Sequence, residues 1–200
     1  MKNIIFASNN KHKAEEIRVI LGSDYQITTL KDAGIDIEIT EPHDTLKENA
    51  IEKARTIFQL TNKNCFSEDT GLEVEALNGA PGVFSARYAG EEATADDNIK
   101  KLLFELNEQP NRMACFTTCI CLILNGKEYF FEGNCAGKIS LTASGTNGFG
   151  YDPVFIPDGY EASFAELDQK VKSEISHRKI AVSKMVEFLH HFNEHPTNKF

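Results

Sequence analysis

Apolar and polar positions along the chain follow two periods, which predict strands and helices in turn. A continuous apolar run over residues 2–7 indicates a buried strand. Apolar positions with helical spacing over 11–21 indicate a helix that ends at Gly22. Short strands are expected over 25–29 and 35–39. The other expected elements are a long helix from about Thr45, helices over 95–106 and 178–192, strands over 113–124 and 127–135, and a strand, an interruption and another strand within 65–77.

Capping and turn residues indicate where several of these elements begin or end. Thr45 and Glu48 have the spacing of a helix capping box, and Thr94 precedes the helix over 95–106. Asn125-Gly126 lies between two extended runs, which is the signal of a tight hairpin. A hairpin pairs its strands antiparallel, whereas a strand followed by a helix favours parallel pairing. The sequence therefore predicts an α/β fold with a mixed sheet.

Length and composition indicate one globular unit. With 200 residues, of which 41% are hydrophobic and 26% charged, the chain can bury one sizeable core. We expect a single domain over residues 1–193 and a flexible tail over 194–200. No segment approaches the ~20 apolar residues of a membrane span, and the first residues lack the pattern of a signal peptide. We therefore expect a cytoplasmic protein that contacts no membrane.

Charge and cysteine content narrow the classes of ligand. A formal net charge of −9 argues against a broad nucleic-acid-binding surface, because such surfaces are basic. An anionic ligand would have to be held by a local cluster of cations or by a metal. Among the five cysteines, Cys119 and Cys121 share a strand face and could in principle hold a metal. Reduced thiols in a core are much commoner, so we interpret them as core residues.

The first polar stretch of interest is "SNNKHK", Ser8 to Lys13, between the first strand and the first helix. A helix N-terminus carries partial positive charge and normally attracts acids, but here Lys11, His12 and Lys13 come first. One interpretation is a solvated surface that tolerates a small electrostatic mismatch. The other is a phosphate site, in which helix-terminal N–H groups and Lys11 or Lys13 hold an anion.

A second polar stretch, "SEDTG" from Ser67 to Gly71, places adjacent acids between a strand and a glycine. On its own this pattern is commonly a turn. Beside a phosphate site, however, Glu68, Asp69 and Glu41 from "ITEPHDT" would provide the hard oxygen ligands that Mg²⁺ uses together with substrate phosphates. A carboxylate that does not bind the metal could orient or deprotonate a water.

Two further stretches each allow a structural and a functional interpretation. "SGTNGFGYDPVF" combines glycines with Phe149 and Tyr151, so it is either a packed loop or a stacking surface for a flat base. "KSEISHRK" contains Lys172, His177 and Arg178 near the start of the last helix. It is either a helix cap with surface charge or a set of donors that converge on a ligand.

In this order and spacing, "SNNKHK", "SEDTGLEVEALNGAPGVFSARYAG", "GTNGFGYDPVF" and "KSEISHR" resemble the inosine triphosphate pyrophosphatase family, over roughly residues 3–192. The resemblance implies an elongated α/β fold in which a long mixed sheet, flanked by helices, forms two lobes around a central nucleotide-binding cleft. It also implies a homodimer and a requirement for Mg²⁺. The implied reaction is hydrolysis of non-standard purine nucleoside triphosphates (dITP, ITP, XTP) to the monophosphate and pyrophosphate, which cleanses the nucleotide pool.

The resemblance also implies roles for individual residues. Glu41 and Asp69 match the metal-binding acids. Asp69, assisted by Glu68 or by the metal, matches the base that positions a water on the α-phosphorus. The positions that match substrate contacts are Ser8, Asn9, Asn10, Lys11, His12, Lys13, Thr70, Phe149, Gly150, Tyr151, Asp152, Lys172, Ser176, His177 and Arg178. Two departures stand out: Ser8-Asn9 replaces a frequent Thr-Gly, which could alter the backbone path of the loop, and Tyr151 stands where some relatives have Trp.

Base selectivity is expected to depend on the purine 6-position. Donors such as His177, Arg178 or a backbone N–H would pair with O6 of hypoxanthine but face another donor in adenine, at a cost of ~1–3 kcal/mol. The sequence does not indicate how guanine is rejected. Two other functions fit the same residues. One is a pyrophosphatase for pyrimidine or modified nucleotides, against which "SHR" argues; the other is a non-hydrolysing nucleotide sensor, which the acids at 68 and 69 disfavour.

Overall fold

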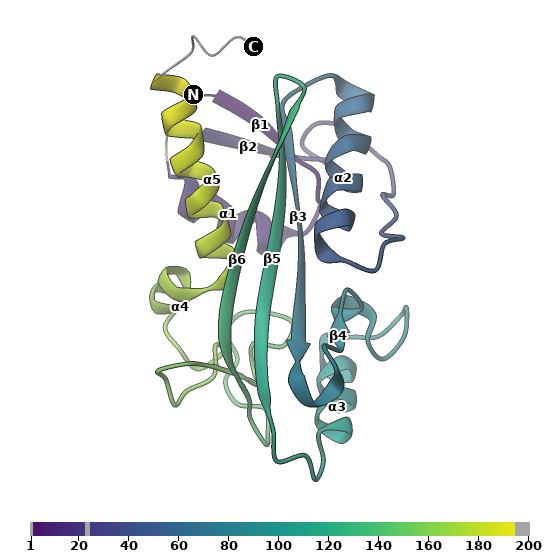
Figure 1. Cartoon of the computed structure of the whole chain (residues 1–200), viewed down its shortest axis with the longest axis vertical. Coiled ribbons are helices and arrows are strands. Elements are labelled where there is room, and N and C mark those ends of the chain that lie inside the picture. Colours follow the sequence, from purple (N-terminus) through teal and green to yellow (C-terminus); the bar gives the residue numbers. More distant parts are fainter. Residues whose placement is uncertain (1, 23–24, 195–200) are drawn as a thin grey trace.

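Three long strands, β3, β5 and β6, run along the molecule, and the helices lie on both sides of them (Figure 1). The computed structural model describes residues 2–22 and 25–194. Within them, seven strands form one sheet in the order β2-β1-β3-β5-β6-β7, with β4 paired to β3. Because β1 pairs in parallel with β2 and β3 while the other pairs are antiparallel, the predicted mixed sheet is confirmed. The strands are β1 (Lys2–Phe6), β2 (Tyr25–Thr29), β3 (Cys65–Val74), β4 (Pro81–Gly82), β5 (Met113–Leu124), β6 (Lys127–Ile139) and β7 (Phe155–Pro157).

Two of the helices begin directly after the predicted capping residues. Thr45 accepts a hydrogen bond from the N–H of Glu48, and Thr94 forms a full capping box with Asp97. No helix in the described ranges is long and apolar enough to cross a membrane. The helical elements are α1 (Lys11–Leu21), α2 (Leu46–Thr61), η1 (Glu75–Leu77), η2 (Ser85–Arg87), α3 (Ala95–Glu105), α4 (Gln169–Ile175) and α5 (His177–Glu194).

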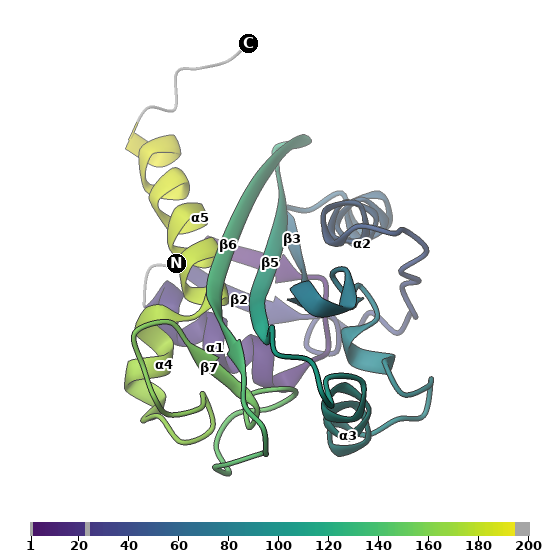
Figure 2. The same ribbon diagram turned by 60° about the horizontal axis from the view of Figure 1, so that its bottom comes forward.

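Apolar clusters divide the helices between the two ends of the long strands. At one end, α1 and α5 pack on one face of the sheet and α2 packs on the other, as Figure 1 shows. At the opposite end, α3 and residues 151–164 pack against the end of β3 and the start of β5. Figure 2 turns this end forward, with α3 and α4 on opposite sides of the long strands. Residues 67–70 in the middle of β3 belong to none of these clusters, so polar side chains lie between two packed halves.

Residues 35–39 do not form the predicted strand. In the described part of the chain they pair with no other strand, and they begin an irregular segment that leads to α2. Ile35 and Ile39 pack against the apolar cluster beneath α2. The alternation of apolar residues therefore reflects anchoring of an extended segment and not sheet pairing.

The predicted interruption within 65–77 is absent, since β3 continues through Gly71. Because Gly71 has no side chain, the neighbouring strand β4 can approach β3 closely. A Cβ on Gly71 would lie 2.5 Å from the Gly82 carbonyl oxygen. The glycine that suggests a break in the sequence thus permits close pairing.

Other boundaries shift without changing the fold. The hairpin at Asn125-Gly126 is confirmed, with positive φ at both residues. β6 extends to Ile139 instead of 135, with alternating burial along its second half. The last helix begins at His177 after the short helix α4, which the sequence pattern did not indicate. Of the predicted tail over 194–200, all but the first residue lies outside the described residues.

The cysteines are free thiols. Burial raises the pKa of Cys119 and of Cys121 to about 12. Both thiols are therefore protonated inside the protein, as expected for core residues.

Candidate active site

The turn between β1 and α1 forms the first wall of the site. Ser8 Oγ accepts a hydrogen bond from Asn10 N–H (3.1 Å), and Asn10 Oδ1 accepts one from Lys13 N–H (3.1 Å). Asn9 Oδ1 accepts one from Lys31 N–H (2.8 Å), which ties the turn to the end of β2. Helix α1 starts directly after this turn, so the positive end of its dipole lies there. Its first helical turn contains no acid that would neutralise this charge. A cavity of about 290 Å³ opens here, lined by residues that include Ser8, Asn9, Asn10, Lys13, Glu41, Lys53 and Glu68.

β3 supplies the second wall, with consecutive side chains on opposite faces of the sheet. Glu68 and Thr70 face α5, where Arg178 contacts both. Asp69 faces α2, where Lys53 contacts it. Two acids that are adjacent in the sequence therefore belong to separate groups of charges.

Cations occupy both oxygens of Glu68. Arg178 Nε and Nη2 donate to the two oxygens (2.9 and 3.1 Å), and Lys13 Nζ lies 3.0 Å from Oε1. Burial alone would raise the pKa of Glu68, but the charges of Arg178 and Lys13 hold that pKa well below its usual range. Arg178 also donates to Glu16 and, at 3.4 Å, to Thr70 Oγ1. Glu68 is thus an ionised anchor for Arg178 and Lys13.

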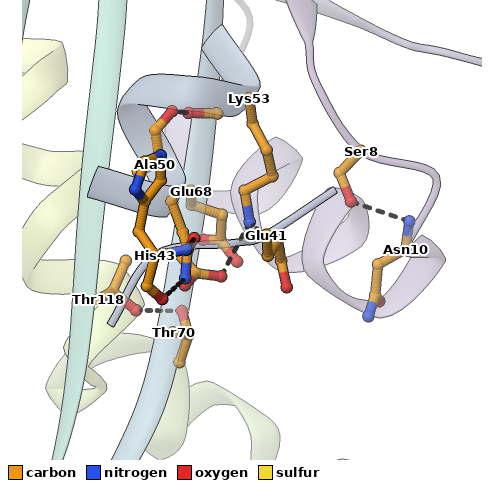
Figure 3. Close-up of polar contacts among 12 residues, drawn as sticks. Ser8, Asn10, Glu41, His43, Ala50, Lys53, Glu68, Thr70 and Thr118 are labelled. Atoms are coloured by element: carbon orange, nitrogen blue, oxygen red, sulfur yellow. Dashed lines mark hydrogen bonds and ion pairs between the residues drawn. The ribbon is translucent and has the colours of Figure 1, made fainter. Parts of the chain in front are cut away.

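On the other face of β3, Lys53 joins two carboxylates (Figure 3). Its Nζ donates to Asp69 Oδ1 (2.8 Å) and to Glu41 Oε1, while Arg87 Nη1 lies 3.7 Å from Glu41 Oε2. Burial raises the pKa of Asp69 above its usual value despite Lys53, and the charge of Glu41 adds to this rise. Burial would also raise the pKa of Glu41, but the charge of Lys53 lowers it overall. The surroundings thus shift the two pKa values in opposite directions, that of Asp69 upward and that of Glu41 downward.

The pair of carboxylates fits a hard divalent cation. Glu41 and Asp69 both accept a hydrogen bond from Lys53 Nζ, so one oxygen of each carboxylate lies beside the same positive charge. Among the described residues, no group of three or more His, Cys, Asp or Glu side chains is placed to hold a metal. Mg²⁺ commonly takes only one or two protein carboxylates and completes its shell with water and phosphate oxygens. Glu41 and Asp69 are suited to such an open site.

A second polar cluster lies where α1 meets α4 and α5. Lys172 Nζ donates to Asp152 Oδ2 (2.7 Å) and to Glu16 Oε1 (2.9 Å). Glu16 also accepts from Arg178, so this one carboxylate joins two buried cations. Burial raises the pKa of Asp152, and the charge of Lys172 opposes that rise. The cluster links the start of α5 to the loop before β7.

Phe149 closes this cluster on one side. Its N–H donates to Asp152 Oδ2 (2.7 Å), and its ring stacks on His12 with centroids 5.2 Å apart and planes at 17°. Lys172 Nζ and Arg178 Cζ lie 5.1 and 5.6 Å from the ring centroid, within the range of cation–π contacts. An aromatic ring thus lies against buried cations, as a flat base could.

His177 opens α5 and is buried. Its ring stacks on Phe116 with centroids 4.6 Å apart, and its Nδ1 has no hydrogen-bond partner among the described residues. Burial, followed by the charge of Arg178, lowers the pKa of His177 well below its usual value, so the ring is neutral. Gly133 on β6 permits this close packing, because a Cβ there would lie 2.1 Å from the His177 carbonyl oxygen.

Comparison with known proteins identifies the family. The model of the Ham1 family matches residues 4–188. The chain belongs to the Ham1 family. It is similar to the dITP/XTP pyrophosphatase of Flavobacterium johnsoniae (48% identity, covering 93% of this chain and 97% of the relative). The protein of the same name from Porphyromonas gingivalis is 50% identical, covering 94% and 98%.

Solved Ham1 structures have the same fold. The Ham1 protein of Staphylococcus aureus superposes with a TM-score of 0.87 at 38% identity, covering 95% of this chain and 99% of that one. The HAM1 protein of Coxiella burnetii gives 0.88 at 36% identity, covering 96% and 100%. The family resemblance and the fold class expected from the sequence are therefore confirmed.

In this Ham1-family chain, most of the predicted site residues lie at the turn before α1, around Glu68 and Asp69 on β3, or in the second polar cluster. Four have other surroundings. Lys11 is exposed on the first turn of α1. The hydroxyl of Tyr151 donates to the Ser85 carbonyl (2.9 Å), which places it in the packing between segments. Ser176 Oγ accepts from Lys179 N–H (3.2 Å) at the start of α5, and Gly150 provides a positive φ in its loop.

Sequence reasoning missed Lys53 and Glu16. Lys53 lies on the apolar face of α2 with Ala50 and Ile57, a position where an unpaired charge would be unfavourable. That exception to the helical pattern was a detectable signal. Glu16, one turn after Lys13, gave no comparable signal, because a single acid in a polar stretch of helical sequence is ordinary.

Proposed function

We propose that this chain hydrolyses non-standard purine nucleoside triphosphates (dITP, ITP and XTP) to the monophosphate and pyrophosphate, with Mg²⁺ as cofactor. The observation that carries the proposal is the convergence of Glu41, Lys53 and Asp69 beside the positive end of α1. A site for a triphosphate needs cations and a divalent metal to balance about four negative charges. The names of the relatives at 48% and 50% identity support the same reaction.

The turn from Ser8 to Asn10 receives the phosphates. Among the described residues, the Asn10 side chain accepts the N–H of Lys13 alone, so other N–H groups of the first turn of α1 can donate to an anion. The Lys13 ammonium, held by Glu68, adds positive charge at the same place. Lys11 and His12 lie on the same turn and complete the predicted phosphate loop.

Asp69 is the proposed base. Its raised pKa makes it a better proton acceptor than an ordinary carboxylate, and it orients a water toward the α-phosphorus while pyrophosphate leaves. Glu41 and Asp69 would hold Mg²⁺, which would supply positive charge and Lewis-acid polarisation to the phosphates. Glu68 assists indirectly, because both of its oxygens are used to hold Arg178 and Lys13.

The purine base of the substrate binds at the second polar cluster, where Phe149 offers a ring for stacking. The Arg178 nitrogens already donate to Glu68, Glu16 and Thr70, so we assign reading of O6 to His177 or a backbone N–H near it. A site that donates to O6 faces the amino group of adenine with another donor and disfavours it. The remaining residues of the proposed base subsite are Gly150, Tyr151, Asp152, Lys172 and Ser176.

We also propose that the protein acts as a homodimer in the cytoplasm, where it removes non-standard purine triphosphates before they enter DNA and RNA. This part of the proposal is supported by the resemblance of the sequence motifs to the pyrophosphatase family. Sedimentation equilibrium of the purified chain tests the dimer directly, since a monomer mass of 22.3 kDa at micromolar concentration would refute it.

A panel of nucleoside triphosphates with a pyrophosphate readout tests the reaction. With Mg²⁺, ITP, dITP and XTP should yield monophosphate and pyrophosphate in equal amounts, and ATP, dTTP and UTP should react much more slowly. Faster reaction of dTTP or UTP would favour a pyrimidine nucleotide pyrophosphatase. Release of orthophosphate without pyrophosphate would refute attack at the α-phosphorus, and binding without hydrolysis would indicate a nucleotide sensor.

A further inference from the structure

The segment of residues 36–45, which carries Glu41, is not held by the sheet or within a helix. In the described ranges, no backbone–backbone hydrogen bond involves residues 36–44. Ile39 packs on the apolar cluster beneath α2, and the Glu41 carboxylate pairs with Lys53. Because apolar contacts are non-directional, the position of the Glu41 main chain depends on polar contacts made by its neighbours.

Asn49 provides such a contact. It lies near the start of α2, is fully buried, and uses both ends of its amide on one residue. Its Oδ1 accepts from His43 N–H (2.9 Å), and its Nδ2 donates to the His43 carbonyl (3.1 Å). His43 is two residues from Glu41, while Lys53, one helical turn after Asn49, holds the Glu41 side chain. Figure 3 shows Glu41 and His43 beside this part of α2.

The stability of α2 does not by itself account for an asparagine at this position. Asparagine favours helix less than alanine or leucine, and a buried amide costs free energy unless both ends are bonded. Apart from Lys53, the other buried positions of α2 are occupied by apolar residues: Leu46, Ala50, Ala54 and Ile57. An apolar residue would suit the helix better, so the contribution of Asn49 lies in its bonds to His43.

We propose that Asn49 is a positioning residue that places the Glu41 carboxylate for binding a divalent cation together with Asp69. This rests on the proposed function, in which those two acids hold Mg²⁺. Removal of groups that orient metal ligands commonly weakens metal binding by about 10- to 100-fold. Asn49 acts through the main chain of the segment, so an effect near the lower end, about 10-fold, is expected.

The test measures binding of Mn²⁺ alone to the whole chain, with free Mn²⁺ detected by electron paramagnetic resonance. Asn49→Ala should raise the Mn²⁺ dissociation constant by about 10-fold, and Glu41→Gln by more. In activity assays, the Mg²⁺ concentration for half-maximal rate should rise in parallel, while kcat at saturating Mg²⁺ stays within about twofold. Amide hydrogen exchange over residues 36–44 should become faster in Asn49→Ala.

Asn98→Ala is a chemically matched control. Asn98 is a buried asparagine on α3 whose amide accepts from Ala89 N–H (2.7 Å) and donates to the Ala86 carbonyl (3.0 Å). It should lower the unfolding temperature as much as Asn49→Ala does without weakening Mn²⁺ binding. Loosening of Arg87 in that segment would remove a positive charge from beside Glu41, and on charge alone this would strengthen binding of a cation.

A second pair of variants tests the same contact without altering the buried helix. His43→Pro removes the N–H that Asn49 accepts, whereas His43→Ala retains it and loses only the side chain. Of these two variants, only His43→Pro should weaken Mn²⁺ binding. This comparison stays decisive if Asn49→Ala fails to fold, because the His43 side chain is partly exposed at the surface.

The outcomes separate the two proposals. If Glu41→Gln weakens Mn²⁺ binding but neither Asn49→Ala nor His43→Pro does, the role of Asn49 is refuted and the proposed function stands. If Asn98→Ala weakens binding as much as Asn49→Ala, the effect is general destabilisation and the role is again refuted. If the wild type does not bind Mn²⁺, or Glu41→Gln leaves binding unchanged, the metal site and the role of Asn49 are refuted together.

Discussion

Replacing Lys53 by methionine tests whether a buried ammonium holds Asp69 and Glu41 together. Methionine retains much of the aliphatic stem of lysine and removes its charge. The Lys53 side chain is only 9% exposed and that of Asp69 8%, so water compensates little for the lost partner. The variant leaves two carboxylates facing each other in the space between α2 and β3.

The magnitude follows from the 2.8 Å separation of Lys53 Nζ and Asp69 Oδ1. With an effective dielectric constant of about 20, the attraction is about 6 kcal/mol before desolvation is subtracted. Burial of both groups offsets much of this attraction, and removal of one partner from a buried pair typically costs ~3–5 kcal/mol. We expect Lys53→Met to lower the free energy of unfolding by about 3 kcal/mol at pH 7.

The loss should depend on pH with a definite sign. In the variant, the pKa of Asp69 rises further and that of Glu41 is no longer held low by Lys53. A carboxyl whose pKa is raised by folding binds its proton more tightly in the folded state, so stability returns as the pH falls toward that raised pKa. The difference between wild type and variant should therefore shrink from pH 7 to pH 5.

Urea unfolding of both proteins at several pH values between 5 and 8 measures this difference. Arg55→Met is the control on the same helix, because Arg55 pairs with Glu128 (2.6 Å) at the surface, where the arginine side chain is 52% exposed. Exposed pairs contribute only ~0–1 kcal/mol, with little dependence on pH in this range. A loss for Lys53→Met below about 1 kcal/mol at pH 7, or one that does not shrink at pH 5, would refute the reasoning.

Three further variants test the proposed roles. Asp69→Asn should abolish hydrolysis while the protein stays folded; retention of more than about a tenth of kcat, a loss below ~1.4 kcal/mol, would contradict a role as base. Lys13→Ala should weaken binding of the triphosphate more than that of the nucleoside, and added salt should reduce the difference; equal losses would contradict phosphate contact. His177→Ala should bring kcat/KM for ITP and ATP closer together, with thermal unfolding as control; an unchanged ratio would assign base reading to the backbone.

Elements with strong local signals could be predicted from the sequence. The hairpin at Asn125-Gly126 and the caps at Thr45 and Thr94 depend on neighbouring residues alone, so their patterns are visible in the chain. Residues 35–39 have the alternation of a strand, but they pair with no strand within residues 2–22 and 25–194. Pairing is a property of the tertiary structure, and no local pattern reports it.

The candidate site was predicted as a set of residues but not as a set of contacts. The sequence places Glu68 and Asp69 side by side, and strand geometry sends them to opposite faces. Glu68 pairs with Arg178, which is 110 residues away in the sequence, and Asp69 pairs with Lys53, which is 16 residues away. These pairings depend on how the helices pack on the sheet. Lys53 could have been found as a charge on an apolar helix face, whereas the pairing of Glu16 with Lys172 required the packing of α1 against α4 and α5.

The bonds of Arg178 bear on how a purine is recognised. Its guanidinium donates to both oxygens of Glu68 and to Glu16, and it is fully buried. Three of its five N–H groups are used on these two carboxylates, and a fourth reaches Thr70 Oγ1 at 3.4 Å. A contact with O6 that turned the guanidinium away from either carboxylate would leave a buried charge unpaired, at a cost of ~3–5 kcal/mol. That cost exceeds the ~1–3 kcal/mol gained by discriminating one carbonyl from one amino group. We therefore propose that Arg178 contributes mainly by fixing Glu68, and through it Lys13, while His177 or a backbone N–H near it reads O6.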